Sequence, residues 1–251
     1  MRILIVGNGG REHTLAWKLQ RDAPEATLFV TQPNGGMTGV EPVGIPSGDV
    51  VALAGWASAE HIDLVVVGPE GPLAAGLVDR LERHGIAAFG PTKAAARIES
   101  SKSYAQTLME RAGVPTADSA SFADHGEASA YVKEHGAPIV VKASGLAAGK
   151  GAIVCETVDE ALEALESIMA DRAFGEAGRE VVVQEFMTGE EISVFALADG
   201  LDAVLMLPSQ DYKRVGEGDV GLNTGGMGAY APVSLSSDAL LAQVQDEIIK
   251  P

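Results

Sequence analysis

The stretch PIVVKASGLAAGKGAIVC, residues 138–155, places a glycine-rich loop between two short apolar runs. Its spacing departs from that of a P-loop at two points, because only three residues separate Gly145 from Gly149, and Gly151 follows Lys150 where a P-loop has Ser or Thr. A P-loop also joins a strand to a helix, whereas both runs here are rich in β-branched residues. We therefore predict a loop that joins two strands and closes as a flap over a ligand.

The chain before this loop alternates short apolar runs with helical patterns over its first ninety residues. This alternation is typical of a parallel sheet that is covered by helices on both faces. The runs at 2–7 (RILIVG) and 63–68 (DLVVVG) are almost wholly apolar, as buried parallel strands are. We therefore predict an α/β, doubly wound parallel-sheet domain over residues 1–100, with ligands at the carboxyl ends of its strands.

A helical pattern at 92–113 follows, and we interpret residues 101–117 as a hinge or helical connection. Residues 118–189 form a predicted α+β unit in which a mixed sheet carries helices. Residues 190–251 add strands, a polar glycine-rich tract at 209–230 and a final helix. The other expected elements are helices at 12–22, 50–61, 73–85, 126–136, 158–170 and 236–250, and strands at 138–142, 152–155, 180–186, 192–198 and 202–207.

The composition indicates a globular protein with a large core, since 46% of the 251 residues are hydrophobic. The formal net charge of −17 disfavours nucleic-acid binding, which depends on basic patches. No apolar run approaches the roughly 20 residues of a membrane span, so we expect no membrane partner and a cytoplasmic protein. We also expect a monomer. The single cysteine, Cys155, has apolar neighbours and is interpreted as a packed side chain without chemistry.

The turn at 7–13 (GNGGREH) resembles the opening of a dinucleotide-binding fingerprint but has Glu12 where the third glycine belongs. No acidic residue ends the second strand to hold a ribose, so the signal for NAD is weak. Backbone N–H groups at a helix N-terminus, helped by Arg11, suit a phosphate, and a purely structural turn is the alternative. In the turn at 68–73 (GPEGPL), Glu70 suits sugar hydroxyls, and an ordinary turn is again the alternative.

Two lysines accompany the predicted flap, Lys142 at the end of the strand before it and Lys150 within it. The flap also offers backbone N–H groups and the flexibility to close over a polyphosphate and exclude water. Glycines that serve turn geometry alone are the alternative. In so lysine-poor a chain, we favour the functional interpretation.

Two later segments offer polar groups for a nucleotide and a substrate. The strand end at 184–187 (QEFM) presents backbone C=O and N–H groups that suit an adenine edge, and the Glu191 carboxylate suits ribose hydroxyls. The 209–230 tract gathers Asp211, Lys213, Arg214, Asn223 and Thr224 around glycines. These groups suit a substrate carboxylate and a developing acyl phosphate, and a surface loop is the alternative. We find no Ser-His-Asp or Cys-His set and no zinc-ligand spacing in the sequence.

Taken in order, six segments closely resemble the glycinamide ribonucleotide synthetase family of the ATP-grasp superfamily. These segments are ILIVGNGGREHTLAWKL, VVVGPEGPL, FGPTKAAARIESSKSYAQTLM, PIVVKASGLAAGKGAIV, VVVQEFMTGEEIS and SQDYKRVGEGDVGLNTGGMGAY. The resemblance implies an ATP-dependent ligase that joins glycine to 5-phosphoribosylamine through glycyl phosphate, with ATP and Mg²⁺ as cofactors. It also implies that 118–189 is the small subdomain of an ATP-grasp fold, and that 190–251 begins its central domain.

By matching positions, the resemblance assigns three sets of residues. The ATP-binding set is Lys102, Lys142, Gly145, Gly149, Lys150, Gly151, Gln184, Glu185, Phe186, Met187 and Glu191. The catalytic set is Asp211, Lys213, Arg214, Thr224, Gly225 and Gly226, with the segment from Thr224 to Gly228 expected as a loop. The set near 5-phosphoribosylamine is Gly9, Gly10, Arg11 and Glu70.

The sequence departs from the family pattern in two ways. Gln184 stands where the family usually has Glu, and we expect its side-chain oxygen to accept from the adenine amino group. The family chain also continues past the point matched by Pro251, so we expect the ATP-grasp region to be incomplete, the Mg²⁺ ligands to lie beyond residue 251, and this chain alone to be inactive. The alternatives are another ATP-grasp carboxylate-amine ligase and a noncatalytic nucleotide-binding module, and a dehydrogenase ranks last.

Overall fold

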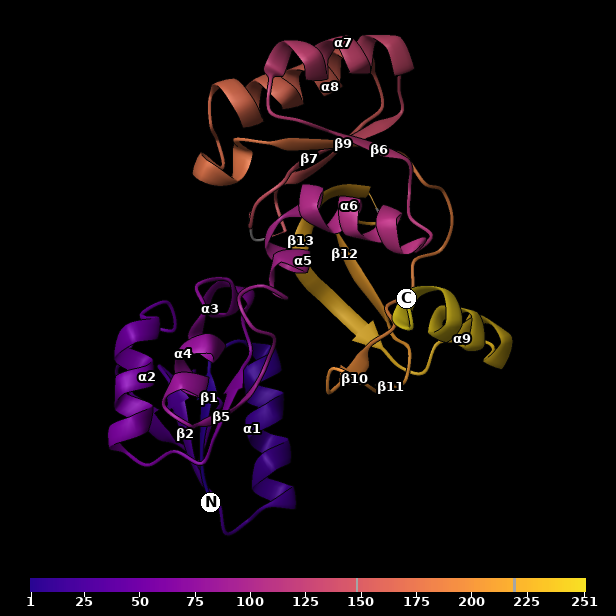
Figure 1. Ribbon diagram of the computed structural model, residues 1–251. Coiled ribbons are helices and arrows are strands. Elements are labelled where there is room, and N and C mark those ends of the chain that lie inside the picture. The colour runs from indigo at the N-terminus through magenta and orange to yellow at the C-terminus, as the bar shows by residue number, and fades with distance from the viewer. Residues whose placement is uncertain (148, 219) are drawn as a thin grey trace. The chain divides into compact units, whose positions relative to one another are not determined.

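The computed structural model describes residues 1–147, 149–218 and 220–251. The chain divides into two compact units, Met1–Ser100 and Ser101–Pro251, each with its own sheet (Figure 1). Within the described ranges, no helix is both long enough and apolar enough to cross a membrane.

The first unit is a five-stranded parallel sheet in the order β3-β2-β1-β4-β5. The strands are β1 (Arg2–Val6), β2 (Thr27–Thr31), β3 (Glu41–Val43), β4 (Leu64–Val67) and β5 (Ala87–Phe89). The helices are α1 (Gly10–Asp22), α2 (Val50–Ala59), α3 (Glu70–Ala74), α4 (Leu77–Arg83) and α5 (Arg97–Ser100). The predicted doubly wound parallel sheet is therefore confirmed.

Both faces of this sheet are buried because successive side chains of each strand point to opposite faces. In β1, Ile3 and Ile5 belong to the core cluster that includes residues of α1, whereas Leu4 and Val6 belong to the cluster that includes residues of α2 and α4. Figure 1 shows α1 on one side of the strands and α2 on the other. Burying each such side chain stabilises the fold by about 1.5–3 kcal/mol. The unbroken apolar run of β1 therefore favours a central place in the sheet, where both faces are covered.

The strand order creates a topological switch point at β1. The chain leaves β1 toward β2 on one side, and β4 pairs with β1 on the other side. The turns that follow β1 and β4 therefore lie at the same edge of the sheet, on either side of the point where ligands of such sheets bind.

Two details of the first unit differ from the sequence-based expectations. The predicted helix at 73–85 is interrupted, because Gly76 has a φ of +85° that ends α3 and begins α4. The edge strand β3 was not predicted, since its sequence, EPV, combines an exposed acid with a proline.

The second unit begins with α6 (Lys102–Ala112) and a four-stranded sheet in the order β6-β9-β7-β8. The strands are β6 (Ser119–Phe122), β7 (Ile139–Ala143), β8 (Ala152–Cys155) and β9 (Val181–Glu185). Every neighbouring pair is antiparallel, so the predicted mixed sheet is wrong in this respect. The flap joins β7 to β8, which confirms the expected connection between two strands.

The helices α7 (His125–His135) and α8 (Val158–Leu165) cover one face of this sheet (Figure 1). Thr157 and Glu160 form a capping box at the start of α8, which fixes where that helix begins. The helix continues as a π-helical turn at Glu166–Ala170, and a 3-10 turn at Gly175–Gly178 leads toward β9. The opposite face of the sheet carries the half-buried side chains of Lys142 and Gln184.

The predicted helical pattern at 92–113 is not one helix. It breaks at Ser101, whose hydroxyl accepts from the Tyr104 N–H at 3.3 Å and caps α6. The helix α6 ends at Gly113, which adopts a φ of +71° as helix C-caps often do.

The end of the second unit contains two strand pairs and a helix. These are β10 (Ala196–Ala198) with β11 (Ala203–Leu205), β12 (Gln210–Gly216) with β13 (Val220–Tyr230), and α9 (Asp238–Val244), which continues as a π-helical turn at Gln245–Ile249. The strand expected at 192–198 is short, with only an isolated bridge from Ser193 to Ser209 before it. The expected loop from Thr224 to Gly228 is wrong, because these residues lie within β13 of an antiparallel hairpin with register shifts.

Candidate active site

Lys142 projects from the face of the second sheet that α7 and α8 leave uncovered. In β7, Ile139, Val141 and Ala143 are buried in the core beneath those helices, and Lys142 alternates with them. A charged side chain is therefore held at a fixed position on a rigid strand, directly before the flap.

The Lys142 ammonium has one hydrogen-bond partner, Gln184, and one like-charged neighbour, Lys102. Its Nζ donates a hydrogen bond to Oε1 of Gln184 on β9, the strand paired with β7. Burial, and then the positive charge of nearby Lys102, lower the pKa of Lys142 below its ordinary value. The Gln184 oxygen therefore accepts from Lys142 with one lone pair and keeps a second lone pair for the adenine amino group that we expect there.

Lys102 belongs to the same cluster through the first turn of α6. Its backbone N–H donates to the Ser144 carbonyl at 2.8 Å, and its Nζ donates to the Gly145 carbonyl at 3.3 Å. Two ammonium groups thus lie close together at the start of the flap. The two positive charges repel each other, and a nearby anion would offset that repulsion, so the arrangement suits a polyphosphate.

The flap approaches neighbouring backbone closely at its first glycine. A Cβ on Gly145 would lie 2.6 Å from the Ala177 Cα, so only glycine fits there without a shift. Gly149 adopts a φ of +75°, which residues with a Cβ rarely adopt. The other predicted flap residues are Lys150, which is exposed, and Gly151, whose carbonyl accepts from Ala143 N–H at 2.7 Å. Ala148, inside the predicted flap, lies outside the described residues.

A partly buried network that the sequence did not predict anchors the base of the flap. The Ser103 hydroxyl bonds the hydroxyl of buried Ser144 at 3.0 Å and donates to Glu180 Oε2 at 2.7 Å. The Ser144 N–H donates to the Glu180 carbonyl at 2.9 Å, and the Gly145 N–H donates to the Ala177 carbonyl at 3.1 Å. These bonds tie Ser144 and Gly145, at the base of the flap, to the segment that leads into β9.

The predicted adenine hinge at 184–187 leaves β9 beside β6. The Glu185 N–H donates to the Asp118 carbonyl at 2.9 Å, and Glu185 Oε2 accepts from the Asp118 N–H at 3.1 Å. The Glu185 N–H therefore already has a partner within the protein. An adenine base would have to bind the backbone groups that follow this N–H in the chain. Phe186 is half-buried, and Met187 is 66% exposed.

Lys213, predicted at the reacting centre, is paired with Glu191, predicted at the ribose. Its Nζ lies 2.5 Å from Glu191 Oε1 and 3.6 Å from Asp211 Oδ1. The hydrogen bond to Glu191 raises the pKa of Lys213 above its ordinary value, against an opposing effect of burial. The structure thus joins two residues that the sequence assigned to different parts of the site.

The hairpin β12–β13 holds the rest of the predicted catalytic set. The Thr224 hydroxyl donates to the Lys213 carbonyl at 2.8 Å and accepts from the Gly226 N–H at 3.1 Å. Arg214 lies half-buried on β12, and Gly225 lies between Thr224 and Gly226 on β13. Thr224 therefore fixes the local backbone of both strands.

In the first unit, the predicted substrate residues lie at the switch point. Gly9 is the N-cap of α1, and Gly10 and Arg11 begin that helix after β1. Glu70 is the first residue of α3 after β4 and is exposed. The sequence missed Glu12, which is 3% exposed and accepts hydrogen bonds from Gly9 and Arg11. One indication of it was present in the sequence, because Glu12 stands where the dinucleotide fingerprint has its third glycine.

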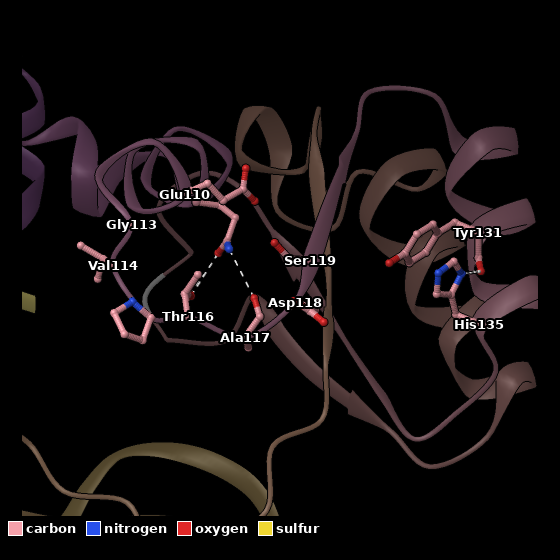
Figure 2. A pocket seen from close by; sticks show the side chains of 11 residues that line it. Glu110, Gly113, Val114, Thr116, Ala117, Asp118, Ser119, Tyr131 and His135 are labelled. Atoms are coloured by element: carbon pink, nitrogen blue, oxygen red, sulfur yellow. Dashed lines mark hydrogen bonds between the residues drawn. The ribbon is translucent and has the colours of Figure 1, made fainter. Parts of the chain in front are cut away.

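A polar cavity of about 590 Å³ lies at the edge of the second sheet, and its lining includes Asp118, the partner of Glu185. Figure 2 shows the segment after α6 on one side of it and the stacked rings of Tyr131 and His135 on the other. The buried Gln106 amide donates to the Ala117 carbonyl at 3.3 Å and accepts from the Thr116 hydroxyl at 3.5 Å. These bonds fix the connection between α6 and β6, and we assign this cavity no ligand.

A magnesium ion needs several oxygen ligands, chiefly carboxylates, in one place. Within 1–147, 149–218 and 220–251, no three His, Cys, Asp or Glu side chains are gathered as metal ligands. We derive no step through a metal from these residues.

The second unit has the fold of the ATP-grasp class, and an α/β unit precedes it in the chain. Residues 100–251 match the phosphoribosylglycinamide synthetase ATP-grasp (A) domain, and residues 1–99 match the phosphoribosylglycinamide synthetase N domain. The chain therefore belongs to the phosphoribosylglycinamide synthetase family, which confirms the resemblance in its sequence.

Individual relatives agree with this assignment. The chain is 48% identical over 252 residues to a phosphoribosylamine-glycine ligase of Ralstonia nicotianae, covering 100% of this chain and 60% of that protein. The crystal structure of phosphoribosylamine-glycine ligase from Thermotoga maritima is 30% identical, with a TM-score of 0.79 over 98% of this chain and 60% of that one. Carboxyaminoimidazole ribonucleotide synthase from Aspergillus clavatus, complexed with ATP, shares the fold at 17% identity, with a TM-score of 0.72 over 98% of this chain and 60% of that one. The chain thus spans about 60% of the length of these relatives.

Proposed function

We propose that this chain carries the nucleotide-binding and sugar-phosphate-binding parts of an ATP-dependent ligase that joins glycine to 5-phosphoribosylamine. The observation that supports this most is the pair of ammonium groups, Lys102 and Lys142, at the base of a glycine flap. Membership of the phosphoribosylglycinamide synthetase family supports the particular substrates.

The chemistry explains why ATP is needed. A carboxylate does not acylate an amine, because its oxygen is a poor leaving group. Attack of the glycine carboxylate oxygen on the γ-phosphorus of ATP releases ADP and gives glycyl phosphate. The amine of 5-phosphoribosylamine then attacks the carbonyl carbon and expels phosphate, giving glycinamide ribonucleotide. Lys102 and Lys142 would neutralise the negative charge on the phosphates, and the flap would exclude water.

Binding would replace the contacts that the site residues make with one another. A phosphate would take over the free donors of Lys142, and the 184–187 segment with Glu191 would hold the nucleoside. Lys213 would then be free to face the glycine carboxylate and the acyl phosphate, beside Arg214 and residues 224–226, and Asp211 would line the same place. Lys213 would thus exchange the Glu191 carboxylate for the anions of the substrate, which limits the cost of desolvating its ammonium.

The first unit would bind the other substrate. Gly9, Gly10, Arg11 and Glu70 lie at the switch point, where backbone N–H groups and a guanidinium suit a phosphate and a carboxylate suits sugar hydroxyls. We propose 1–100 as this substrate-binding domain. We also propose 101–117, 118–189 and 190–251 as the connection, the small ATP-grasp subdomain and the start of the central domain. Glycine and 5-phosphoribosylamine would be its small-molecule partners, in a cytoplasmic monomer without nucleic-acid or membrane partners.

The test separates nucleotide binding from turnover. ATP binding is measured by calorimetry on residues 1–251, and ADP release is measured on a chimera in which these residues are joined to the part of the Ralstonia nicotianae relative that follows the matched region. We expect the chain to bind ATP. We expect the chimera to release ADP only when Mg²⁺, glycine and 5-phosphoribosylamine are all present.

Other outcomes favour the alternatives. ADP release that needs an amino acid other than glycine would identify another carboxylate-amine ligase. ATP binding by a folded chimera that never turns over would favour a noncatalytic nucleotide-binding module. If neither protein binds ATP, the proposal is wrong.

A further inference from the structure

Glu12 is an unusual carboxylate in this chain because it is buried. Its exposed fraction is 3%, although it lies in the first turn of α1 and next to exposed Arg11. Acidic side chains are seldom buried unless each oxygen has a hydrogen-bond partner. The partners of Glu12 therefore indicate what the residue does.

Each oxygen of Glu12 accepts from a different part of the switch-point turn. Oε2 accepts from the Gly9 N–H at 2.7 Å, which fixes the N-cap of α1. Oε1 accepts from Nε of Arg11, also at 2.7 Å. The carboxylate thus links the backbone of the turn to the guanidinium of the predicted phosphate-binding residue.

The same carboxylate fills the space between the turns after β1 and β4. A Cβ on Gly68 would lie 2.0 Å from Glu12 Oε1, and a Cβ on Gly7 would lie 2.8 Å from Glu12 Cδ. The Gly7 N–H in turn donates to the hydroxyl of buried Thr31 on β2 at 2.7 Å. Glycines at 7 and 68 therefore make room for Glu12, whose carboxylate lies against both turns.

The contact with Glu12 leaves one edge of the Arg11 guanidinium available. Arg11 has five N–H donors, of which Nε supplies one and the two Nη atoms supply four. In the described part of the chain, the Nη atoms have no hydrogen-bond partner, and the side chain is 59% exposed. The Nη fork matches the oxygens of a phosphate in a bidentate arrangement.

We infer that Glu12 is a positioning residue, which holds the Nε edge of Arg11 so that its Nη fork receives the phosphate monoester of the sugar substrate. This inference rests on the proposed function, because it assigns the sugar phosphate to the switch point of the first unit. Glu12 itself does not touch the ligand. It acts by restricting Arg11 and the Gly9 N–H before the ligand arrives, which lowers the entropy lost on binding.

Glu12→Gln is the variant that tests this role. The amide keeps the size of the carboxylate but has one acceptor oxygen, and its NH₂ group would face either the Gly9 N–H or the Arg11 Nε–H, both of which are donors. One of the two contacts must therefore be lost. Glu25→Gln, at an exposed position just after α1, removes the same charge from the same unit and serves as the matched control.

The experiment uses the 251-residue chain with ribose 5-phosphate and, separately, ribose as probes, titrated by NMR at low ionic strength and well below the melting temperature of each variant. We expect wild type and Glu25→Gln to bind ribose 5-phosphate alike and Glu12→Gln to bind it about tenfold more weakly, the loss of one charge-assisted hydrogen bond. The weak affinity for ribose should stay unchanged in all three, which a general loss of structure would not produce.

A folded Glu12→Gln variant that binds ribose 5-phosphate within twofold of wild type overturns the inference and leaves the proposed function intact. Failure of the wild type to bind ribose 5-phosphate overturns both. If Glu12→Gln does not fold, exchange of the Arg11 Nε–H proton in the wild type decides the question. Protection that persists in the complex supports the inference, and protection lost on binding overturns it.

Discussion

Lys142 carries the prediction that follows most directly from the structure. Replacing it by Met keeps an unbranched chain of similar length and removes only the ammonium group. That ammonium has three N–H donors, of which one is used by Gln184, so two remain for ATP. We therefore expect Lys142→Met to weaken ATP binding while leaving the fold intact.

The magnitude follows from the number and type of contacts that are lost. A hydrogen bond to a charged group contributes about 1.5–3 kcal/mol, and about 1.4 kcal/mol corresponds to a factor of ten. Removal of one such contact weakens ATP binding by about 10- to 100-fold. Lys133, an exposed lysine on α7, gives the matched control Lys133→Met, which we expect to change affinity by less than about twofold.

The same variant has a predicted signature in stability. The pKa of Lys142 is lowered in the folded state from its ordinary value of 10.5, so the unfolded chain keeps this proton to higher pH. The free energy of unfolding of the wild type should therefore rise with pH between the lowered pKa and 10.5, and this rise should be absent from Lys142→Met. Lys213 has a raised pKa and acts in the opposite sense, but it contributes equally to both proteins and cancels in the difference.

Calorimetric titration with ATP and urea unfolding at several pH values measure these two effects. Equal ATP affinities of Lys142→Met and Lys133→Met would refute a role of the Lys142 ammonium in binding ATP. A difference in unfolding free energy between wild type and Lys142→Met that does not change with pH would refute the lowered pKa of Lys142.

Two further predictions concern packing in the second unit. Gly145→Ala places a Cβ 2.6 Å from the Ala177 Cα, so it should lower the free energy of unfolding in urea titrations by about 1–3 kcal/mol. Gly71→Ala, which has open space around its Cβ, should not lower it. Equal stabilities of the two variants would contradict the close approach at Gly145. Burial raises the pKa of the Cys155 thiol to about 11, so alkylation by iodoacetamide at pH 8 should proceed only as fast as the protein opens. Rapid stoichiometric labelling without denaturant would contradict that burial.

The strands with unbroken apolar runs could be predicted from the sequence because burial on both faces leaves little choice of residue. β1 and β4 are such strands, and β7 and β9 are nearly so. The edge strands β3 and β6 were missed, since their short sequences, EPV and SASF, have no apolar periodicity.

The glycine-rich tract at 209–230 shows the limit of local patterns. Residues 224–228 were expected as a loop, but the backbone forms a β-hairpin with register shifts. Pairing between β12 and β13 depends on backbone groups that are present whatever the side chain, so composition alone does not reveal it.

Only those parts of the candidate site that are adjacent in sequence could be predicted, for a related reason. Lys142 and the flap are adjacent in sequence, so their proximity could be predicted. The contacts of Ser103 with Ser144 and with Glu180 join residues 41 and 77 positions apart, and no local pattern indicates them. The pairing of Lys142 with Gln184 likewise depends on the register of β7 and β9.

The location of the nucleotide is the central claim, and a crystal structure of the chain with a non-hydrolysable ATP analogue tests it most directly. We predict that the phosphates lie within hydrogen-bond distance of Lys142 Nζ and of the flap backbone, with adenine against residues 184–187 and the Lys142 to Gln184 contact rearranged. A nucleotide bound at the turn of Gly9 and Arg11, with no density beside Lys142, would contradict it.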